Sequence, residues 1–307
     1  MGEPGSQTSP LAGLALGVVA ASTAAVLIRL AAAPALTATA WRLAGSGLFY
    51  ILAFAALKRQ WPWHGMARPE LLLAGGAATA LAFHFITWIA SLDHTSVVSS
   101  VVLVWTAPIW VALGSRAFLK EAPARLTWIG IFVALAGVVC ITLFDRSAAG
   151  ASANPHSLLG DALALIGAVG MAAYFLIGRR LRQRIGTVQY VAAVYGGAGL
   201  ISMAVVGATA TPLLAFEPLT LVYLGLLALV PQIVGHTMFN WAVRYVTATL
   251  ATVAGLMTPI GATILAWIVL REAPGVGQVA GSLVVFTGVL LAGRGERSAG
   301  RIAAGEE

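Results

Sequence analysis

The sequence predicts an all-α integral membrane protein with ten transmembrane helices, arranged as two five-helix repeats of inverted topology. Three observations support this prediction: an apolar composition, long apolar stretches between short charged clusters, and a sequence pattern that occurs twice. Of the 307 residues, 59% are hydrophobic and only 9% are charged, and the mean hydropathy is +0.90. Such a chain has too little polar surface for a soluble globule of its size, so it belongs in a lipid bilayer.

A helix that spans a membrane needs roughly 20 mostly apolar residues. The charged clusters leave about ten stretches of this length, and each is expected to cross the bilayer once. The first stretch is interpreted as a span rather than a signal peptide, because the segment MGEPGSQTSP before it carries no Lys or Arg. In chain order the expected spans are 11–33, 36–57, 70–91, 95–119, 126–144, 158–177, 188–206, 219–243, 247–270 and 276–292.

The distribution of positive charge predicts the orientation of these spans. Most of the 18 lysines and arginines fall in loops and ends on one side of the membrane. Only Arg29, Arg146 and Arg271 fall on the other side, and Arg42 lies inside the second span. Cytoplasmic loops carry such an excess of Lys and Arg, so both termini are expected in the cytoplasm. The net charge of +7 is therefore a topology signal and does not indicate nucleic-acid binding.

A proline and an acidic stop occur twice at one constant spacing. The stretch PIWVALGSRAFLKEAP begins at Pro108 and contains Glu121 near its end. The stretch PIGATILAWIVLREAP begins at Pro259 and contains Glu272 at the matching position. Chance similarity between apolar helices does not usually preserve prolines, acids and glycines together. We therefore expect two five-helix repeats at 11–145 and 158–293, with cytoplasmic tails at 1–10 and 294–307. The same spacing pairs Gly130 with Gly281 and Gly137 with Gly288.

Because five is an odd number, the second repeat enters the membrane from the side opposite to the first. Inverted repeats are the ground plan of many secondary transporters, whose substrate site lies near the midplane between the repeats. Pro108 and Pro259 each remove a backbone hydrogen bond inside a span. Glu121 and Glu272 lie at helix ends, where an acid opposes the helix dipole and needs a compensating partner. We expect a structural or gating role for these four residues, and packing alone remains an alternative for the prolines.

The sequence resembles the EamA branch of the drug/metabolite transporter superfamily. The resemblance rests on two five-helix units, each with a proline in the fourth span, the stop LKEAP or LREAP, and a fifth span with the pattern Gly-x-x-x-x-x-x-Gly. Within that branch, the third span AFHFITWIASLDHTS is most similar to YddG-type exporters of aromatic and other neutral amino acids. The resemblance implies a central cavity between the halves and efflux of small metabolites. The scarcity of lysine beside abundant Ala, Gly and Arg suggests a bacterial cytoplasmic membrane.

Polar residues near mid-depth should face the protein interior, because exposing them to lipid is costly. Gln232, His236 and Asn240 lie at intervals of four residues in the eighth span, which places them on one helical face. His84 and Trp88 have the same spacing in the third span. We expect these five residues to line the substrate cavity, and hydrogen bonding between helices is the alternative.

Three further residues are candidates for the cavity wall. Trp41 and Tyr174 could supply aromatic surface, although such residues are more often used in packing. Arg42 could hold a substrate carboxylate, but its position in the second span favours snorkelling to the outer face or a structural bond.

The residues that are absent from the spans narrow the chemistry. Without an Asp, Glu or Lys near mid-span, a cation/proton antiporter is disfavoured, and Arg42 alone is too few donors for a phosphorylated substrate. A neutral zwitterion with an apolar or aromatic side chain, such as an amino acid, fits best. An exporter or importer of drugs or other metabolites, or a metabolite channel, stays open.

Enzyme motifs are missing as well. The sequence has no His-Glu-x-x-His, no Gly-x-Ser-x-Gly and no paired intramembrane aspartates, so no catalytic site is expected. The lone Cys140 excludes a disulfide or cysteine-rich metal site within one chain. The expected partners are a small-molecule substrate and membrane lipid, with no cofactor, metal or nucleic acid, and the sequence is compatible with a monomer.

Overall fold

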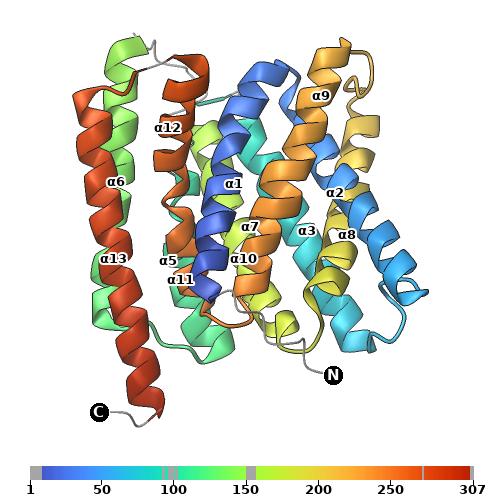
Figure 1. Cartoon of the computed structure of the whole chain (residues 1–307), viewed down its shortest axis with the longest axis horizontal. Helices are drawn as coiled ribbons and strands as arrows, with labels where there is room; N and C mark the ends of the chain where they lie inside the picture. The colour runs from blue at the N-terminus through green and yellow to red at the C-terminus, as the bar shows by residue number, and fades with distance from the viewer. Residues whose placement is uncertain are drawn as a thin grey trace.

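The computed structural model describes residues 9–91, 94–95, 100, 103–149, 157–271 and 273–304, which form helices and short loops and include no β-strand (Figure 1). Their placement confirms an all-helical protein. In chain order the helices are α1 (Pro10–Ala31), α2 (Ala35–Lys58), α3 (Arg68–Ser91), α5 (Ala107–Gly114), η1 (Ser115–Leu119), α6 (Arg125–Ala149), α7 (Ser157–Arg182), α8 (Thr187–Ala208), α9 (Pro218–Leu227), η2 (Ala228–His236), α10 (Thr237–Ala242), α11 (Ala248–Gly255), α12 (Thr258–Leu270) and α13 (Val276–Ala304).

Eight helical stretches in the described part of the chain are long and apolar enough to cross a membrane. The continuous stretches α9–η2–α10 and α11–α12 each count as one of them. The described residues of the fourth and fifth expected spans contribute shorter apolar stretches, Ala107–Leu119 and, within α6, Arg125–Ile141. Part of the fourth expected span lies outside the described residues, so the structure gives eight apolar spans and does not establish the expected total of ten.

Local sequence signals account for several helix ends. Ser9 caps α1, where its Oγ accepts a hydrogen bond from the Ala12 backbone N–H at 3.2 Å. Thr247 caps α11 in the same way for Leu250. The helices that lead into LKEAP and LREAP both end on a left-handed residue, Lys120 with φ 59° and Arg271 with φ 61°. The residues that end the helix in the two copies of the stop thus adopt the same backbone conformation.

Pro108 and Pro259 lie at the start of a helix rather than in the middle of a continuous one. Each follows a break, and each occupies the first turn of a new helix, α5 and α12 respectively. Proline fits this position because a first-turn N–H has no partner in the helix. Both prolines therefore lie inside the expected spans 95–119 and 247–270, and the α-helical winding of each span is interrupted directly before the proline. Glu272 lies outside the described residues.

The helices pack in pairs that connect the two halves of the chain. α6 lies along α13, α2 along α8 and α3 along α7, while α1 packs against α9, η2 and α12. α6 and α13 stand at one side of the bundle, and α1 begins at the end of the bundle where α13 finishes (Figure 1).

Glycines allow α6 and α13 to approach closely. A Cβ on Gly130 would lie 2.3 Å from the backbone N of Ala292, and a Cβ on Gly288 would lie 2.3 Å from the backbone N of Ala134. Gly137 and Gly281 meet the facing backbone at 2.5 and 2.8 Å in the same way. Small residues at such contacts are typical of helix pairs in membranes. The glycines repeated in the sequence therefore hold each fifth helix against its counterpart.

Candidate functional site

A cavity of about 120 Å³ lies inside the bundle. Its wall is formed by residues of α1, α2, α3, α7, η2, α10, α11 and α12, together with Val104 and Trp105, which precede α5. Aromatic side chains make up much of the wall, and the charged or titratable members are Arg42, His84 and His236. A buried, mostly apolar cavity with a few polar groups is the usual form of a small-molecule site.

A second hollow, of about 420 Å³, lies between α2, α3 and α8. Apart from Trp63 and Met203, small and aliphatic residues line it, and none of the described lining residues is charged. Leu48, Leu71 and Leu200 in this lining are exposed, so the hollow is a groove that lipid chains can fill. The smaller central cavity is therefore the candidate functional site.

Arg42 reaches the cavity from the second turn of α2 and is only 6% exposed. Its Nε donates a hydrogen bond to Oε1 of Gln232 at 2.6 Å, which joins α2 to η2. Its guanidinium carbon lies 4.5 Å from the ring centroid of Phe85, within the range of a cation–π contact. The side chain thus points into the protein, and the snorkelling interpretation made from its position in the span does not describe it.

His84 and Trp88 lie together on the α3 side of the cavity. The His84 Nδ1 is 2.9 Å from the carbonyl oxygen of Gly167 in α7, and because a carbonyl only accepts, Nδ1 carries a proton. The rings of His84 and Trp88 are nearly parallel, with centroids 6.1 Å apart. The Nε1 of Trp88 is buried and has no hydrogen-bond partner in the described part of the chain. His84 is therefore fixed by α7, while Trp88 keeps an unused donor.

The three polar residues of the eighth span are divided between two environments. His236 lines the cavity and Gln232 holds Arg42 beside it. Asn240 instead points its Nδ2 to the hydroxyls of Tyr174 at 2.5 Å and Tyr195 at 2.8 Å, and it does not line the cavity. Tyr174 is therefore part of an interhelical network as well.

Trp41 also lies away from the cavity. Its Nε1 donates to the carbonyl oxygen of Leu213 at 2.9 Å, and its ring packs beside the cluster that contains Leu224 and Leu227. The contacts indicate a packing role between α2 and the α8–α9 loop. Of the eight residues predicted to bind substrate, the structure brings Arg42, His84, Trp88 and His236 to the cavity wall, with Gln232 directly behind Arg42.

The π-helix η2 was not anticipated from the sequence. It contains Pro231, and its winding is wider than that of an α-helix, so residues four apart do not keep the alignment that an ideal α-helix gives. The signal in the sequence was Pro231 itself, which lies inside the eighth apolar stretch directly before Gln232. π-Helical segments are frequent at functional sites.

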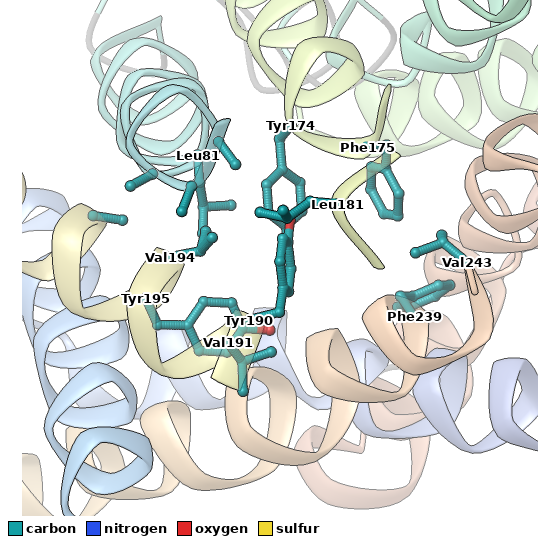
Figure 2. Close-up of a cluster of buried hydrophobic side chains, with 14 of the residues drawn as sticks. Leu81, Tyr174, Phe175, Leu181, Tyr190, Val191, Val194, Tyr195, Phe239 and Val243 are labelled. Carbon is teal, nitrogen blue, oxygen red and sulfur yellow. The ribbon is translucent and has the colours of Figure 1, made fainter. Parts of the chain in front are cut away.

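Next to the cavity, a cluster of buried side chains fills the bundle between α3, α7, α8 and α10 (Figure 2). Phe175 and Phe239 belong both to this cluster and to the cavity wall. Tyr174, Leu181 and Val243 continue the cluster toward the end of α7, and none of them is more than 1% exposed. The cavity is thus closed on this side by packed side chains.

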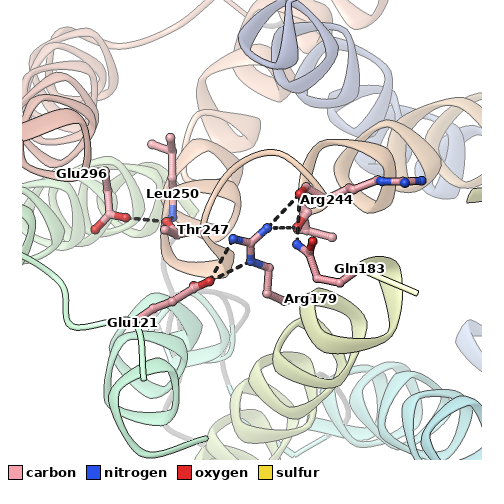
Figure 3. A network of polar contacts seen from close by, with 8 residues as sticks. Glu121, Arg179, Gln183, Arg244, Thr247, Leu250 and Glu296 are labelled. Atoms are coloured by element: carbon pink, nitrogen blue, oxygen red, sulfur yellow. Dashed lines mark hydrogen bonds and ion pairs between the residues drawn. The ribbon is translucent and has the colours of Figure 1, made fainter. Parts of the chain in front are cut away.

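Beyond the cluster, Arg179 of α7 joins three segments (Figure 3). Its Nε and Nη2 each lie 2.9 Å from Oε1 of Glu121, and its Nη1 donates to the carbonyl oxygens of Val243 at 2.8 Å and Arg244 at 3.0 Å. Arg179 supplies the compensating partner that the position of Glu121 predicted. We call these contacts the Arg179 latch. In the sequence, Arg179 is one of the basic residues assigned to the loops on the cytoplasmic side.

Nearby, Glu296 of α13 accepts a hydrogen bond from Thr247, the N-cap of α11 (Figure 3). It accepts another from Thr127 of α6. The start of α11 is therefore tied to the α6–α13 pair, while the loop before it is tied to α7 by the latch.

The apolar bundle with a buried cavity between helices defines a multi-pass membrane protein of the transporter class. The model of the EamA-like transporter family matches residues 9–143 and again residues 158–294. The chain belongs to this family of small-molecule transporters in the drug/metabolite superfamily, and the family indicates a transporter rather than an enzyme.

Several bacterial proteins are similar in sequence. The uncharacterized transporter YdfC of Bacillus subtilis (strain 168) is 29% identical over 224 residues, which cover 72% of this chain and 70% of YdfC. The uncharacterized inner membrane transporter YedA of Escherichia coli (strain K12) is 28% identical over 56% of this chain and 55% of its own. A riboflavin transporter of Rhizobium johnstonii is 27% identical over 43% of this chain and 42% of its own. These names do not confirm the closer resemblance to YddG-type amino acid exporters.

Among solved structures with a similar fold is a protein crystal structure. It aligns with a TM-score of 0.81, covers 95% of this chain and 99% of its own, and is 19% identical in sequence. At that identity the likeness concerns the fold alone.

Proposed function

We propose that the protein is a secondary transporter that exports small metabolites with an apolar or aromatic body, amino acids among them, by alternating access through the central cavity. The observation that carries the proposal is the composition of the cavity wall. The wall contains pairs of residues whose two members are separated by the same spacing that relates Pro108 to Pro259. These pairs are Ala24 with Phe175, Phe85 with His236, Trp88 with Phe239, and Val104 with Gly255.

Two inverted five-helix repeats, within 11–145 and 158–293, account for such a wall, since a site on the axis between the repeats draws on both. The family model matches twice, once in each proposed repeat. The helix pairs support the same arrangement, because α2 with α8 and α6 with α13 are counterparts at the repeat spacing. Ten spans follow if Ala107–Leu119 and Arg125–Ile141 belong to the fourth and fifth crossings.

The two halves differ in how deeply their corresponding helices are buried, and alternating access requires a difference of this kind. In α5 and η1 the buried residues include Pro108, Val111 and Ser115, whereas their counterpart α12 has no buried residue. A transporter with inverted repeats must differ between its halves when one end is closed and the other open. We therefore interpret this conformation as closed at the end of the Arg179 latch and more open at the end of α12.

The orientation belongs to the same proposal. With both termini in the cytoplasm, the latch faces the cytoplasm of a bacterial inner membrane and the end of α12 faces outward.

Single cysteines on either side of α8 test this orientation. In a Cys140→Ala background, Arg184→Cys before α8 and Ala215→Cys after it should react with an impermeant thiol reagent from opposite sides, position 184 from the cytoplasm. Both positions are exposed. Labelling of both from the same side would contradict the proposed topology.

Restoring a backbone N–H donor at the break between α11 and α12 should slow transport. Pro259 lacks the N–H that would bond to the carbonyl of Gly255, a residue of the cavity wall. In Pro259→Ala that bond can form and join α11 to α12, so the transport rate should fall at least several-fold while the protein stays folded.

Pro218→Ala is the matched control, because Pro218 also lies in a first helical turn but at the end of a span. It should transport at the wild-type rate. A wild-type rate in Pro259→Ala would limit that proline to packing.

The function itself is tested in proteoliposomes loaded with labelled neutral amino acids. Saturable flux that is stimulated by substrate on the opposite side identifies a carrier. Flux that neither saturates nor responds to counter-substrate would identify a channel, and a folded protein that moves none of the compounds would contradict the proposal.

A further inference from the structure

We infer that the central cavity recognises a carboxylate through Arg42, and that the transported class is therefore small monocarboxylates with an apolar or aromatic body, for which an ammonium group is dispensable. The inference rests on the proposed function, since it names the chemistry of the substrate for the same cavity. It extends the substrate class beyond amino acids to their deaminated counterparts.

The first step is the hydrogen bonding of Arg42. Its Nε is used by Gln232, and its guanidinium lies over Phe85, so the orientation of the group is fixed. In the described part of the chain, no hydrogen bond or ion pair engages Nη1 or Nη2. Two parallel N–H donors of one guanidinium match the two oxygens of a carboxylate. Arg42 is thus held in place with its carboxylate-binding edge unused.

The second step is the charge of the wall. None of the described residues that line the cavity is Asp or Glu. A buried charge without a counter-charge is unfavourable, and the cation–π contact with Phe85 offsets only part of its lost hydration. A ligand carboxylate would supply the missing charge, whereas a cationic ligand would be repelled by Arg42.

The third step is the surplus of donors. Nε1 of Trp88 and Nδ1 of His236, both on wall residues, are buried and have no hydrogen-bond partner among the residues that the structure describes. Nε2 of Gln232, whose oxygen already accepts from Arg42, is also without a partner. An indole and an amide nitrogen can only donate, whereas Nδ1 of His236 donates or accepts according to its tautomer. Of the wall residues, Trp88 therefore offers a free donor to an acceptor on the ligand.

The rest of the wall determines the body of the ligand. Trp88, Trp105, Phe175 and Phe239 provide aromatic surface around the cavity. A single guanidinium suits one negative charge, because phosphates and dicarboxylates need more cationic donors than this wall contains.

The matched probes are phenylalanine, 3-phenylpropionate, which lacks the ammonium group, and 2-phenylethylamine, which lacks the carboxylate. Binding to the full chain in detergent and counterflow in proteoliposomes are measured for each. Phenylalanine and 3-phenylpropionate should compete with one another for one site. The amine should bind at least tenfold more weakly than either.

Gln232→Glu is the sharpest variant, because it keeps the shape of the side chain and gives Arg42 an internal counter-charge. It should weaken binding of both carboxylates at least tenfold and should not weaken binding of the amine. Arg42→Lys keeps the charge but removes the bidentate edge, and it should weaken the carboxylates in the same direction. Gln189→Glu, the same exchange away from the cavity, should leave all three affinities unchanged.

Amine binding as tight as that of the acids, or unchanged carboxylate affinity in folded Gln232→Glu, would overturn the inference. Counterflow of phenylalanine without 3-phenylpropionate would overturn it too, because the ammonium would then be required, while the proposed transport would stand. Absence of flux for every compound in the folded protein would overturn both the inference and the proposed function.

Discussion

Arg179→Gln is expected to open the latch end of the bundle and to shift the protein toward the state in which the cavity faces the cytoplasm. The substitution removes the ion pair to Glu121 and the charged hydrogen bonds to the carbonyls of Val243 and Arg244. Arg179 and Glu121 are 17% and 27% exposed, so solvent screens them only in part. A hydrogen bond to a charged group contributes about 1.5–3 kcal/mol. Loss of one net bond of this kind would change the equilibrium between the two states roughly tenfold or more.

The shift is measured by the rate at which a cysteine in the cavity wall reacts with an impermeant reagent from the cytoplasmic side. Arg180→Gln is the matched control, because it removes the same charge at the next position, where the side chain is exposed. Arg179→Gln should raise the rate and Arg180→Gln should not. Equal labelling rates in the two variants would show that the latch acts only as a surface ion pair and does not hold this end of the bundle closed.

Gly288→Ala is expected to separate α13 from α6 and to destabilise the folded protein strongly. The added methyl group would lie 2.3 Å from the backbone N of Ala134 and 2.7 Å from its Cα, and neither atom can move without the helix. Overpacking of a well-packed core typically lowers the free energy of unfolding by about 1–3 kcal/mol. We expect a loss in this range or larger, because the obstacle here is a backbone atom. The midpoint of thermal unfolding in detergent should fall by several degrees or more.

Gly293→Ala in the same helix provides the comparison. The nearest atom to its added methyl is Cδ1 of Leu250 at 3.9 Å, an ordinary contact. Because alanine is also the better helix former, this variant should be as stable as the wild type or slightly more stable. Equal losses in both variants would contradict the packing described for α6 and α13.

The helical membrane fold was predictable because apolar length and charge clusters are properties of local sequence. The repeated Pro, Glu and Gly residues were also informative, since the constant spacing marks backbone features: helix starts at Pro108 and Pro259, and close contacts at Gly130 and Gly288. The breaks in the helices before the two prolines were harder to predict from the sequence. A proline is compatible both with a kinked span and with a new helix start, and neighbouring helices decide between them.

The candidate site was predictable in its residue types and less so in its geometry. His84, Trp88 and His236 reach the cavity as their positions near mid-span indicated. Asn240 does not, because Tyr174 and Tyr195 of α7 and α8 engage its amide, and such contacts over long sequence distance leave no periodic signal.

Arg42 illustrates the same limit for charged residues. Snorkelling and burial are equally compatible with an arginine near a span end, and the choice depended on Gln232 and Phe85, which come from other helices. Arg179 was visible only as an inner-loop charge, although Glu121 pointed to a missing partner for its carboxylate.

The central claim is that one cavity between the two halves binds substrate and opens to each side of the membrane in turn. It is tested most directly with Thr252→Cys in a Cys140→Ala background, because Thr252 lines the cavity and its hydroxyl donates to carbonyls of its own helix. Labelling with an impermeant reagent is compared in right-side-out and inside-out vesicles, with and without transported substrate. The account predicts reaction from the outer side, reaction from the cytoplasmic side once Arg179→Gln is added, and protection by substrate in both cases. Reaction from one side only in both proteins, without protection, would contradict it.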